Sequence, residues 1–304
     1  MRRLAPVLSA HLPFLRVSGP GTPKRRLLFI ALAFSVAAAT RAQQAPKRVA
    51  SLNLSADEVL SAILRPSRLV GVTSWADDPS SSNVVGKVPR SAVRFQKVDL
   101  ERLVALSPDL VVVSEYTDAD AQRVLERSGI RVHRMRGLGS IAGVRQAILD
   151  LGRVVGEEPA ARRLVADFDA KLADVARRLA GAPKPRVLYW SGGMTAGADT
   201  AIGSLIECAG GVNVGRELGV AGIAPPGAER AFVADPDVVL VTTWPDAVDS
   251  VRSHPLLGTL KAVREGHVVA MPNELLVALS QYTAEACRDL ATRLHPDRFP
   301  AGAR

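Results

Sequence analysis

The stretch ERLVALSPDLVVV at residues 101–113 recurs as ERAFVADPDVVLV at residues 229–241. Both copies begin with Glu-Arg, pass through short apolar residues to a Pro-Asp pair, and end in a run of valine and leucine. A short helix, a Pro-Asp turn and a buried strand fit this pattern. Because one unit is written twice, far apart in the chain, the sequence predicts two lobes built in the same way.

Short β-branched runs alternate with helical stretches on both sides of these two copies. The predicted strands are 48–52, 68–73, 109–114, 130–135, 186–190, 237–243 and 267–271. The predicted helices include 55–64, 118–129 and 282–294, with Ser55 and Glu58 as a capping box of the first. A helical passage over 140–180 is expected to break at Gly152 and Pro159, which leaves 159–179 as one long helix.

This alternation predicts an α/β fold with two pseudo-equivalent Rossmann-like lobes, joined by a single long α-helix, and a ligand cleft between them. The expected division is a leader at 1–42, an N-terminal lobe at 43–155, a connecting helix at 156–181 and a C-terminal lobe at 182–304.

The positive charge of the chain is concentrated in the leader. The net charge is +9, but residues 1–42 carry seven Lys or Arg and no Asp or Glu, which leaves +2 for the remainder. Nucleic-acid binding is therefore not indicated. The basic Lys24–Arg26, the apolar run 27–39 and the small residues after it are typical of a secretory signal peptide cleaved near Ala42. An uncleaved anchor and a twin-arginine signal are the alternatives, and the product is expected to be exported.

Large aromatic residues are scarce, and most of them stand at the ends of predicted strands. Five of the six Trp and Tyr residues follow or finish predicted strands, at Trp75, Tyr116, Tyr189, Trp190 and Trp244. Ligands of open α/β sheets bind beyond the carboxyl ends of the strands. These rings predict a cleft with flat apolar walls, suited to a large and partly apolar ligand, although each alone could equally be core packing.

Motifs of catalysis are missing from the sequence. It has no G-x-S-x-G elbow, no phosphate loop and no metal-ligand spacing among its histidines. We therefore expect a binding protein without a cofactor or a metal site, and not an enzyme. The two cysteines, Cys208 and Cys287, are either a disulfide, which export favours, or two buried thiols.

The chain resembles the periplasmic solute-binding proteins of ABC importers for vitamin B12, haem and ferric siderophores, and in detail its vitamin B12-binding members. The resemblance covers about residues 48–294. It is carried by RVASLNLSADEVLSAI, VGVTSWADDP, VDLERLVALSPDLVVV, LIECAGGVNV, AERAFVADPDVVLV and the cysteine pair.

The resemblance implies a periplasmic monomer that clamps a small metal-chelate ligand between its lobes and docks on a membrane permease. It implies that Glu101 and Glu229, one in each lobe, contact arginines of that permease, and that Cys208 and Cys287 form a disulfide. Without the resemblance, both glutamates would be first-turn helix residues favoured by the macrodipole.

The sequence leaves three classes of ligand open, a corrinoid, haem and a ferric siderophore. Phe95, with Arg94 and Lys87 nearby, stands in the loop where the vitamin B12-binding members have a tryptophan. Haem would need an axial ligand such as Tyr116 or His254, and an anionic siderophore would need convergent cations such as Arg94 and Lys87. A corrinoid needs aromatic walls, and it is the expected ligand. The predicted ligand-binding residues are Trp75, Phe95, Tyr116, Trp190 and Trp244. From another class, an exported α/β enzyme or a cobalt chelatase is the alternative.

Overall fold

The computed structural model describes residues 44–300. The predicted leader, residues 1–42, lies outside this range. Among residues 44–300, no helix has the length and apolar content needed to cross a membrane.

The first lobe is built on a five-stranded parallel sheet with the order β3-β2-β1-β4-β5. Its strands are β1 (Val49–Ser51), β2 (Leu69–Thr73), β3 (Val93–Phe95), β4 (Leu110–Ser114) and β5 (Val132–Met135). Its helices are α1 (Leu54–Ile63), η1 (Pro66–Arg68), η2 (Ser74–Asp77), α2 (Leu100–Leu106), α3 (Ala119–Arg127) and α4 (Ile141–Val155).

The second lobe repeats this topology with one strand fewer, in the order β11-β10-β6-β8. Its strands are β6 (Arg186–Tyr189), β8 (Val212–Asn213), β10 (Val238–Thr242) and β11 (Val268–Met271), with β7 (Thr195–Ala196) and β9 (Ile223–Ala224) as a separate antiparallel pair. Its helices are α6 (Ala201–Cys208), α7 (Val214–Glu217), α8 (Ala228–Ala234), α9 (Ala247–Arg252), η3 (Leu257–Thr259), α10 (Lys261–Arg264), α11 (Asn273–Leu276), α12 (Thr283–Leu294) and η4 (Pro296–Arg298).

The two sheets are pseudo-equivalent. In each, the first strand of the lobe (β1 or β6) pairs on one side with the next strand of the sheet (β2 or β8) and on the other side with a later strand (β4 or β10). The order of the strands therefore reverses beside β1 and beside β6, and such switch points are where α/β sheets bind ligands. The two lobes predicted from the repeated stretch are confirmed, with α2 and β4 in one copy and α8 and β10 in the other.

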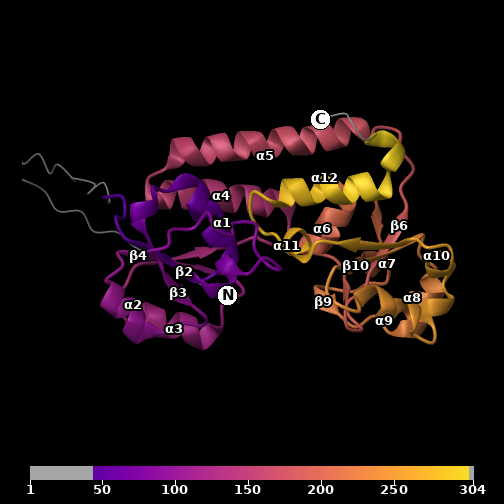
Figure 1. The fold of residues 1–304 in the computed structure, drawn as a ribbon, viewed down its shortest axis with the longest axis horizontal. Helices are drawn as coiled ribbons and strands as arrows, with labels where there is room; N and C mark the ends of the chain where they lie inside the picture. The colour runs from indigo at the N-terminus through magenta and orange to yellow at the C-terminus, as the bar shows by residue number, and fades with distance from the viewer. Residues whose placement is uncertain (1–43, 301–304) are drawn as a thin grey trace, which may run out of the picture. The chain divides into compact units, whose positions relative to one another are not determined.

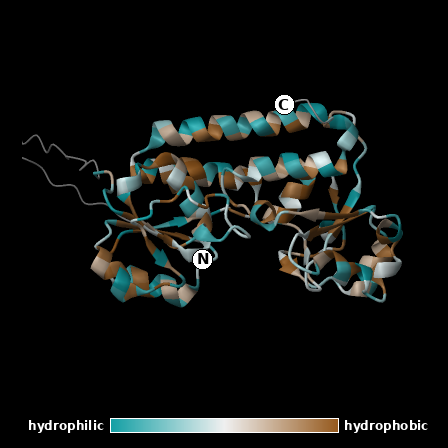
Figure 2. Ribbon diagram, viewed as in Figure 1, coloured by the Kyte–Doolittle hydropathy of each residue, from teal (hydrophilic) through white to brown (hydrophobic). Residues whose placement is uncertain are grey.

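Each sheet lies between two helical layers (Figure 1). One layer contains α4, α5 (Glu158–Arg178) and α12, and the other contains α2 and α3 in lobe one and α8 and α9 in lobe two. Most strand residues of both sheets are hydrophobic (Figure 2). Their side chains alternate between the two layers, so that Val112 packs on the α1–α4 side and Val111 and Val113 pack toward α2 and α3.

Helix α5 takes part in both lobes. Its Val165 and Phe168 are buried in the core of lobe one, whereas Val175 is buried in the core of lobe two. The chain also returns to lobe one after β11, through residues 272–283, called here the return segment. Leu279 and Tyr282 of this segment, and Ala284 just after it, pack on the core of lobe one. Helix α5 thus contributes to both cores, and the chain crosses between the lobes a second time, so the helix is not the single connection that the sequence predicted.

Two local predictions are wrong. Ser55 and Glu58 do not form a capping box, because Asn53 caps α1 by accepting from the Ala56 backbone N–H at 2.9 Å, and Glu58 is buried. Gly152 does not break the helical passage either, because it lies inside α4, where it faces the Ala161 Cβ closely. The break falls at Gly156, whose positive φ of 73° ends α4.

Candidate functional site

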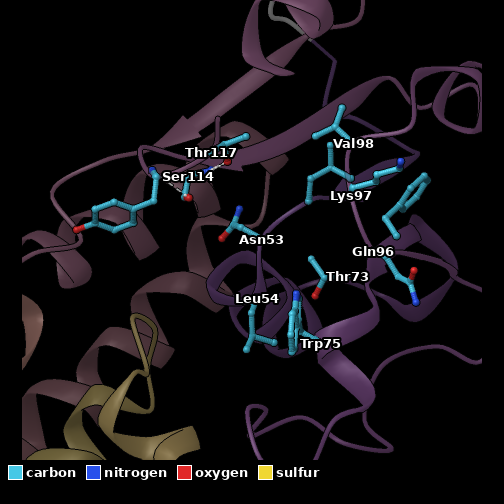
Figure 3. A pocket seen from close by; sticks show the side chains of 12 residues that line it. Asn53, Leu54, Thr73, Trp75, Gln96, Lys97, Val98, Ser114 and Thr117 are labelled. Carbon is cyan, nitrogen blue, oxygen red and sulfur yellow. Dashed lines mark hydrogen bonds between the residues drawn. The ribbon is translucent and has the colours of Figure 1, made fainter. Parts of the chain in front are cut away.

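A cavity of about 280 Å³ opens at the carboxyl ends of four strands of lobe one. Asn53 follows β1, Thr73 ends β2, Phe95 ends β3 and Ser114 ends β4. Figure 3 shows Asn53, Thr73 and Ser114 around this cavity, with the Trp75 ring at its edge. The fold therefore gathers short polar side chains at the switch point, together with Gln96 and Thr117.

The polar side chains of this first cavity are called here the polar niche. Some of them are hydrogen-bonded within the protein and others are not. The Asn53 side-chain oxygen caps α1, while its Nδ2 is buried and has no protein partner. The Thr117 hydroxyl accepts from the Ser114 backbone N–H at 3.1 Å. Unpaired buried donors are costly, so the Asn53 amide favours a ligand that brings an acceptor, such as an amide or carboxylate oxygen.

A second cavity, of about 430 Å³, is apolar and combines residues of both lobes. Tyr116 comes from lobe one, Ile202 and Ile223 from lobe two, and Val277 and Leu279 from the return segment. Tyr116 also borders a third cavity of about 490 Å³ with Glu115, Gly137, Gly139, Ser140 and Asp199. Since Tyr116 lines all three cavities, a ligand larger than any one of them can extend across this residue. We call the three together the cleft.

The lobes meet directly at one side of the cleft. A Cβ added at Gly139 of lobe one would lie 2.6 Å from the backbone oxygen of Asp199 in lobe two. Asp199 itself has a φ of 59°, which is uncommon for a residue other than glycine. Close by, the Ile141 backbone N–H donates to the Ser204 hydroxyl at 3.3 Å. Only glycine at position 139 permits this approach.

The predicted aromatic residues separate into two groups. Trp75, Tyr116 and Trp244 are 55%, 62% and 53% exposed, and the first two line the cleft. Trp190 is 7% exposed and packs in the core between β6, α8 and α9. Its burial follows from strand alternation, because it continues β6 with a backbone bond to Leu240 and lies on the same face as Leu188. Phe95 is 2% exposed, so it is mainly a core residue, although it also lines the first cavity.

The cations that sequence analysis offered for an anionic ligand are engaged elsewhere. Arg94 donates to both carboxylate oxygens of Asp77 and to the Pro89 carbonyl. Lys87 donates to the Asn83 carbonyl at 3.0 Å and to the Tyr282 hydroxyl at 3.1 Å. Among the described residues that line the cleft, Lys97 is the only Lys or Arg.

Two candidate axial ligands of haem have different surroundings. His254 accepts from the Leu256 and Leu257 backbone N–H groups through Nδ1, and its ring meets Trp190 edge-on at 6.1 Å. It is therefore a loop cap of lobe two. Tyr116 is exposed to the cleft, and partial desolvation of its phenol, followed by the neighbouring Glu115 carboxylate, raises the pKa of Tyr116. Across residues 44–300, no cluster of three or more His, Cys, Asp or Glu residues could hold a metal ion.

Two buried carboxyls of α1 have shifted pKa values. Burial raises the pKa of Asp57 to about 8, against hydrogen bonds from the Thr73 hydroxyl and backbone N–H. Burial also raises the pKa of Glu58, against hydrogen bonds from Ser280 and Asn83. A shifted pair in a pocket would favour an enzyme, but neither carboxyl lines the cleft.

The two predicted docking glutamates occupy matching positions. Glu101 lies in the first turn of α2 and Glu229 in the first turn of α8, and both are exposed. Asp99 caps α2 by accepting from the Arg102 backbone N–H at 3.1 Å. Each glutamate is therefore placed on the surface of its own lobe, outside the cleft.

The alternatives left open for the cysteines are resolved. Cys208 of α6 and Cys287 of α12 form a disulfide, with their Cα atoms 5.9 Å apart. It ties two helices that cover the same face of the second sheet.

Sequence analysis missed most of the polar niche and, apart from Tyr116, the lining of the apolar cavity. Asn53, Thr73 and Ser114 each end or directly follow a predicted strand, as Trp75 does, so the same rule would have found them. Ile202, Ile223, Val277 and Leu279 carry no such signal, because they come together only through the contact between lobes.

Residues 49–275 match the family model described as periplasmic binding protein. A cobalamin-binding protein of Halobacterium salinarum is 30% identical over 248 residues, which cover 80% of this chain and 66% of that protein. The matched stretch thus spans about two thirds of that relative. The periplasmic heme-binding protein RhuT of Roseiflexus superposes with a TM-score of 0.69 at 24% identity, over 83% of this chain and 99% of that one. The CeuE protein of Helicobacter pylori does so with a TM-score of 0.72 at 21% identity, over 85% and 86%.

Proposed function

Since the chain belongs to the periplasmic binding protein family, we propose that it is an exported protein that captures a cobalamin-like corrinoid and delivers it to an ABC importer. The proposed ligand class rests on the difference in polarity between two parts of the cleft. Lobe one offers neutral hydrogen-bonding groups beside Trp75, and the second cavity offers aliphatic side chains. A ligand with a broad apolar ring and neutral amide arms fits both linings.

The other two metal-chelate ligands fit this lining less well. An anionic siderophore calls for several convergent cations, and Lys97 is the only one among the described residues of the cleft. For haem, only one of the two side chains offered as an axial ligand lines the cleft, because His254 is engaged in a loop of lobe two. Haem is the second candidate, because Tyr116 is exposed in the centre of the cleft.

We also propose that the mature protein is a periplasmic monomer released from a cleaved signal peptide, and that Glu101 and Glu229 dock it on the permease. One carboxylate on each lobe suits a two-fold permease with paired cations, because rim charges set the orientation of a complex. This part rests on the family resemblance and on the matching first-turn positions of the two residues.

The ligand proposal is tested by titrating the purified mature protein with cyanocobalamin, haemin and a ferric catecholate, using tryptophan fluorescence. We expect cyanocobalamin to bind most tightly. Trp75→Ala should weaken it at least tenfold, about 1.4 kcal/mol, because an exposed ring at the cavity edge is lost. Trp190→Phe is the matched control, since this buried ring should affect stability and leave affinity unchanged. Tighter binding of haemin, or binding of none of the three, would refute the corrinoid proposal.

A further inference from the structure

Glu58 is a buried carboxylate at the junction between lobe one and the return segment. It lies on α1 and is 1% exposed. It accepts hydrogen bonds from the Asn83 backbone N–H at 3.1 Å, from Asn83 Nδ2 at 2.8 Å and from the Ser280 hydroxyl. Asn83 belongs to lobe one and Ser280 to the return segment, so one carboxylate holds both.

Further bonds of the same network reinforce this junction. The Glu58 carbonyl accepts from Gln281 Nε2 at 2.9 Å. Asn83 Nδ2 also donates to the Glu274 carbonyl at 2.8 Å, and Asn273 Nδ2 donates to the Ser80 carbonyl at 3.0 Å. The return segment is therefore fastened to lobe one near both of its ends.

The residues between these fastened points line the cleft. Val277 and Leu279 form part of the apolar cavity, and Leu279 also packs on the core of lobe one. Glu58 does not line any part of the cleft itself. Its partners hold the segment on either side of the two apolar residues, through Ser280 and Gln281 after them and through the bond from Asn83 to the Glu274 carbonyl before them.

A carboxylate is an unusual choice for this position. Burial disfavours its charged form and raises its pKa, and the hydrogen bonds from Ser280 and Asn83 oppose that shift. A buried acceptor with several donors fixes the geometry of its partners more strictly than apolar packing does.

We propose that Glu58 is a positioning residue of the ligand site, which fixes Val277 and Leu279 of the return segment against lobe one. The expected effect of Glu58 on ligand affinity rests on the proposed function. The position of the return segment, however, is a property of the protein without ligand, and it can be measured separately.

The experiment combines hydrogen exchange of the ligand-free protein with cyanocobalamin titration of the same samples. Glu58→Ala should speed amide exchange in residues 272–283 at least tenfold and weaken cyanocobalamin binding about tenfold. Ser280→Ala removes one donor only and should show a smaller change of both quantities. Glu58→Gln should restore both, because its amide oxygen still accepts from Asn83 and its NH₂ group donates to the Ser280 hydroxyl.

Glu157→Gln is the matched control, since Glu157 pairs with Arg68 at 2.6 Å in lobe one, away from the cleft. It should lower the melting temperature without changing exchange in 272–283 or affinity. Unchanged exchange in 272–283 in both Glu58→Ala and Ser280→Ala would overturn the inference. So would an affinity loss no larger than that of Glu157→Gln. If the wild type binds no cyanocobalamin, the proposed function fails, and the exchange data alone decide the role of Glu58.

Discussion

Arg48 and Arg186 make the same contacts in the two lobes. Arg48 Nη2 donates to the Leu106 carbonyl at 2.7 Å, and Arg186 Nη1 donates to the Ala234 carbonyl at 2.6 Å. Each guanidinium thus binds the last residue of the short helix that precedes β4 in lobe one or β10 in lobe two. Each also reaches the carbonyl of the next residue, at 3.2 and 3.1 Å.

The repeated stretch of sequence encodes the same turn between helix and strand in both lobes. Ser107 and Asp235 end their helices with positive φ values of 45° and 41°. The Pro-Asp pair follows, and the carboxylates of Asp109 and Asp237 accept from the backbone N–H of Arg48 and Arg186 at 2.9 and 2.7 Å. The arginine and the aspartate together fix the helix end against the first strand, and so place Glu101 and Glu229 equivalently.

Replacing Glu101 and Glu229 by Ala should abolish uptake through the importer and leave ligand affinity unchanged. Both side chains are exposed and lie outside the cleft, so the double variant removes the proposed contact with the permease and leaves the cleft intact. Vesicles containing the permease would measure uptake, and fluorescence would measure affinity. Glu126→Ala on α3 is the control for removing an exposed glutamate. Normal uptake by the double variant would contradict the docking role.

Asp57→Asn should flatten the dependence of stability on pH. Folded Asp57 keeps its proton up to about pH 8, whereas the unfolded chain loses it near the ordinary value of 3.8. The folded state therefore binds more protons between these values, and its stability falls as pH rises from about 4 to 8. The slope for one proton is at most about 1.4 kcal/mol per pH unit. Urea unfolding at pH 5 and pH 8 checks this, and equal slopes in wild type and variant would contradict it.

Gly139→Ala should push the lobes apart, because its Cβ would lie 2.6 Å from the Asp199 backbone oxygen. We expect a loss of about 1–3 kcal/mol, as for overpacking, and a longer distance between spin labels on Glu126 of α3 and Asp249 of α9. Gly86→Ala is the control, because its φ of 73° strains an alanine while no neighbour lies within 4 Å. An unchanged label distance in Gly139→Ala would show that the contact does not set lobe separation.

Loss of the Cys208–Cys287 disulfide should cost about 4 kcal/mol of unfolding free energy, since it closes a loop across a sequence separation of 79. The double Cys→Ala variant and the reduced wild type should unfold at lower urea concentrations than the oxidised protein. Mass spectrometry would confirm complete reduction. Equal midpoints after complete reduction would contradict the prediction.

The sequence predicted most strongly what local patterns encode. Valine-rich runs identified seven strands, and the two Glu-Arg copies identified the pair of lobes. Glu58 was misassigned because its spacing from Ser55 fits a capping box, whereas its partners Asn83 and Ser280 are distant in the chain. Trp190 could have been placed correctly, since alternation along β6 puts it on the same face as the buried Leu188. The strands β7, β8 and β9 contain two residues each, too few for any periodicity.

The second crossing of the chain has a consequence for how this protein is made. The core of lobe one includes Ala284 and packs Leu279 and Tyr282, all of which emerge in the last tenth of synthesis. The N-terminal half alone would expose the apolar surface that these residues cover. A fragment ending before residue 272 therefore lacks residues that complete the core of its first lobe.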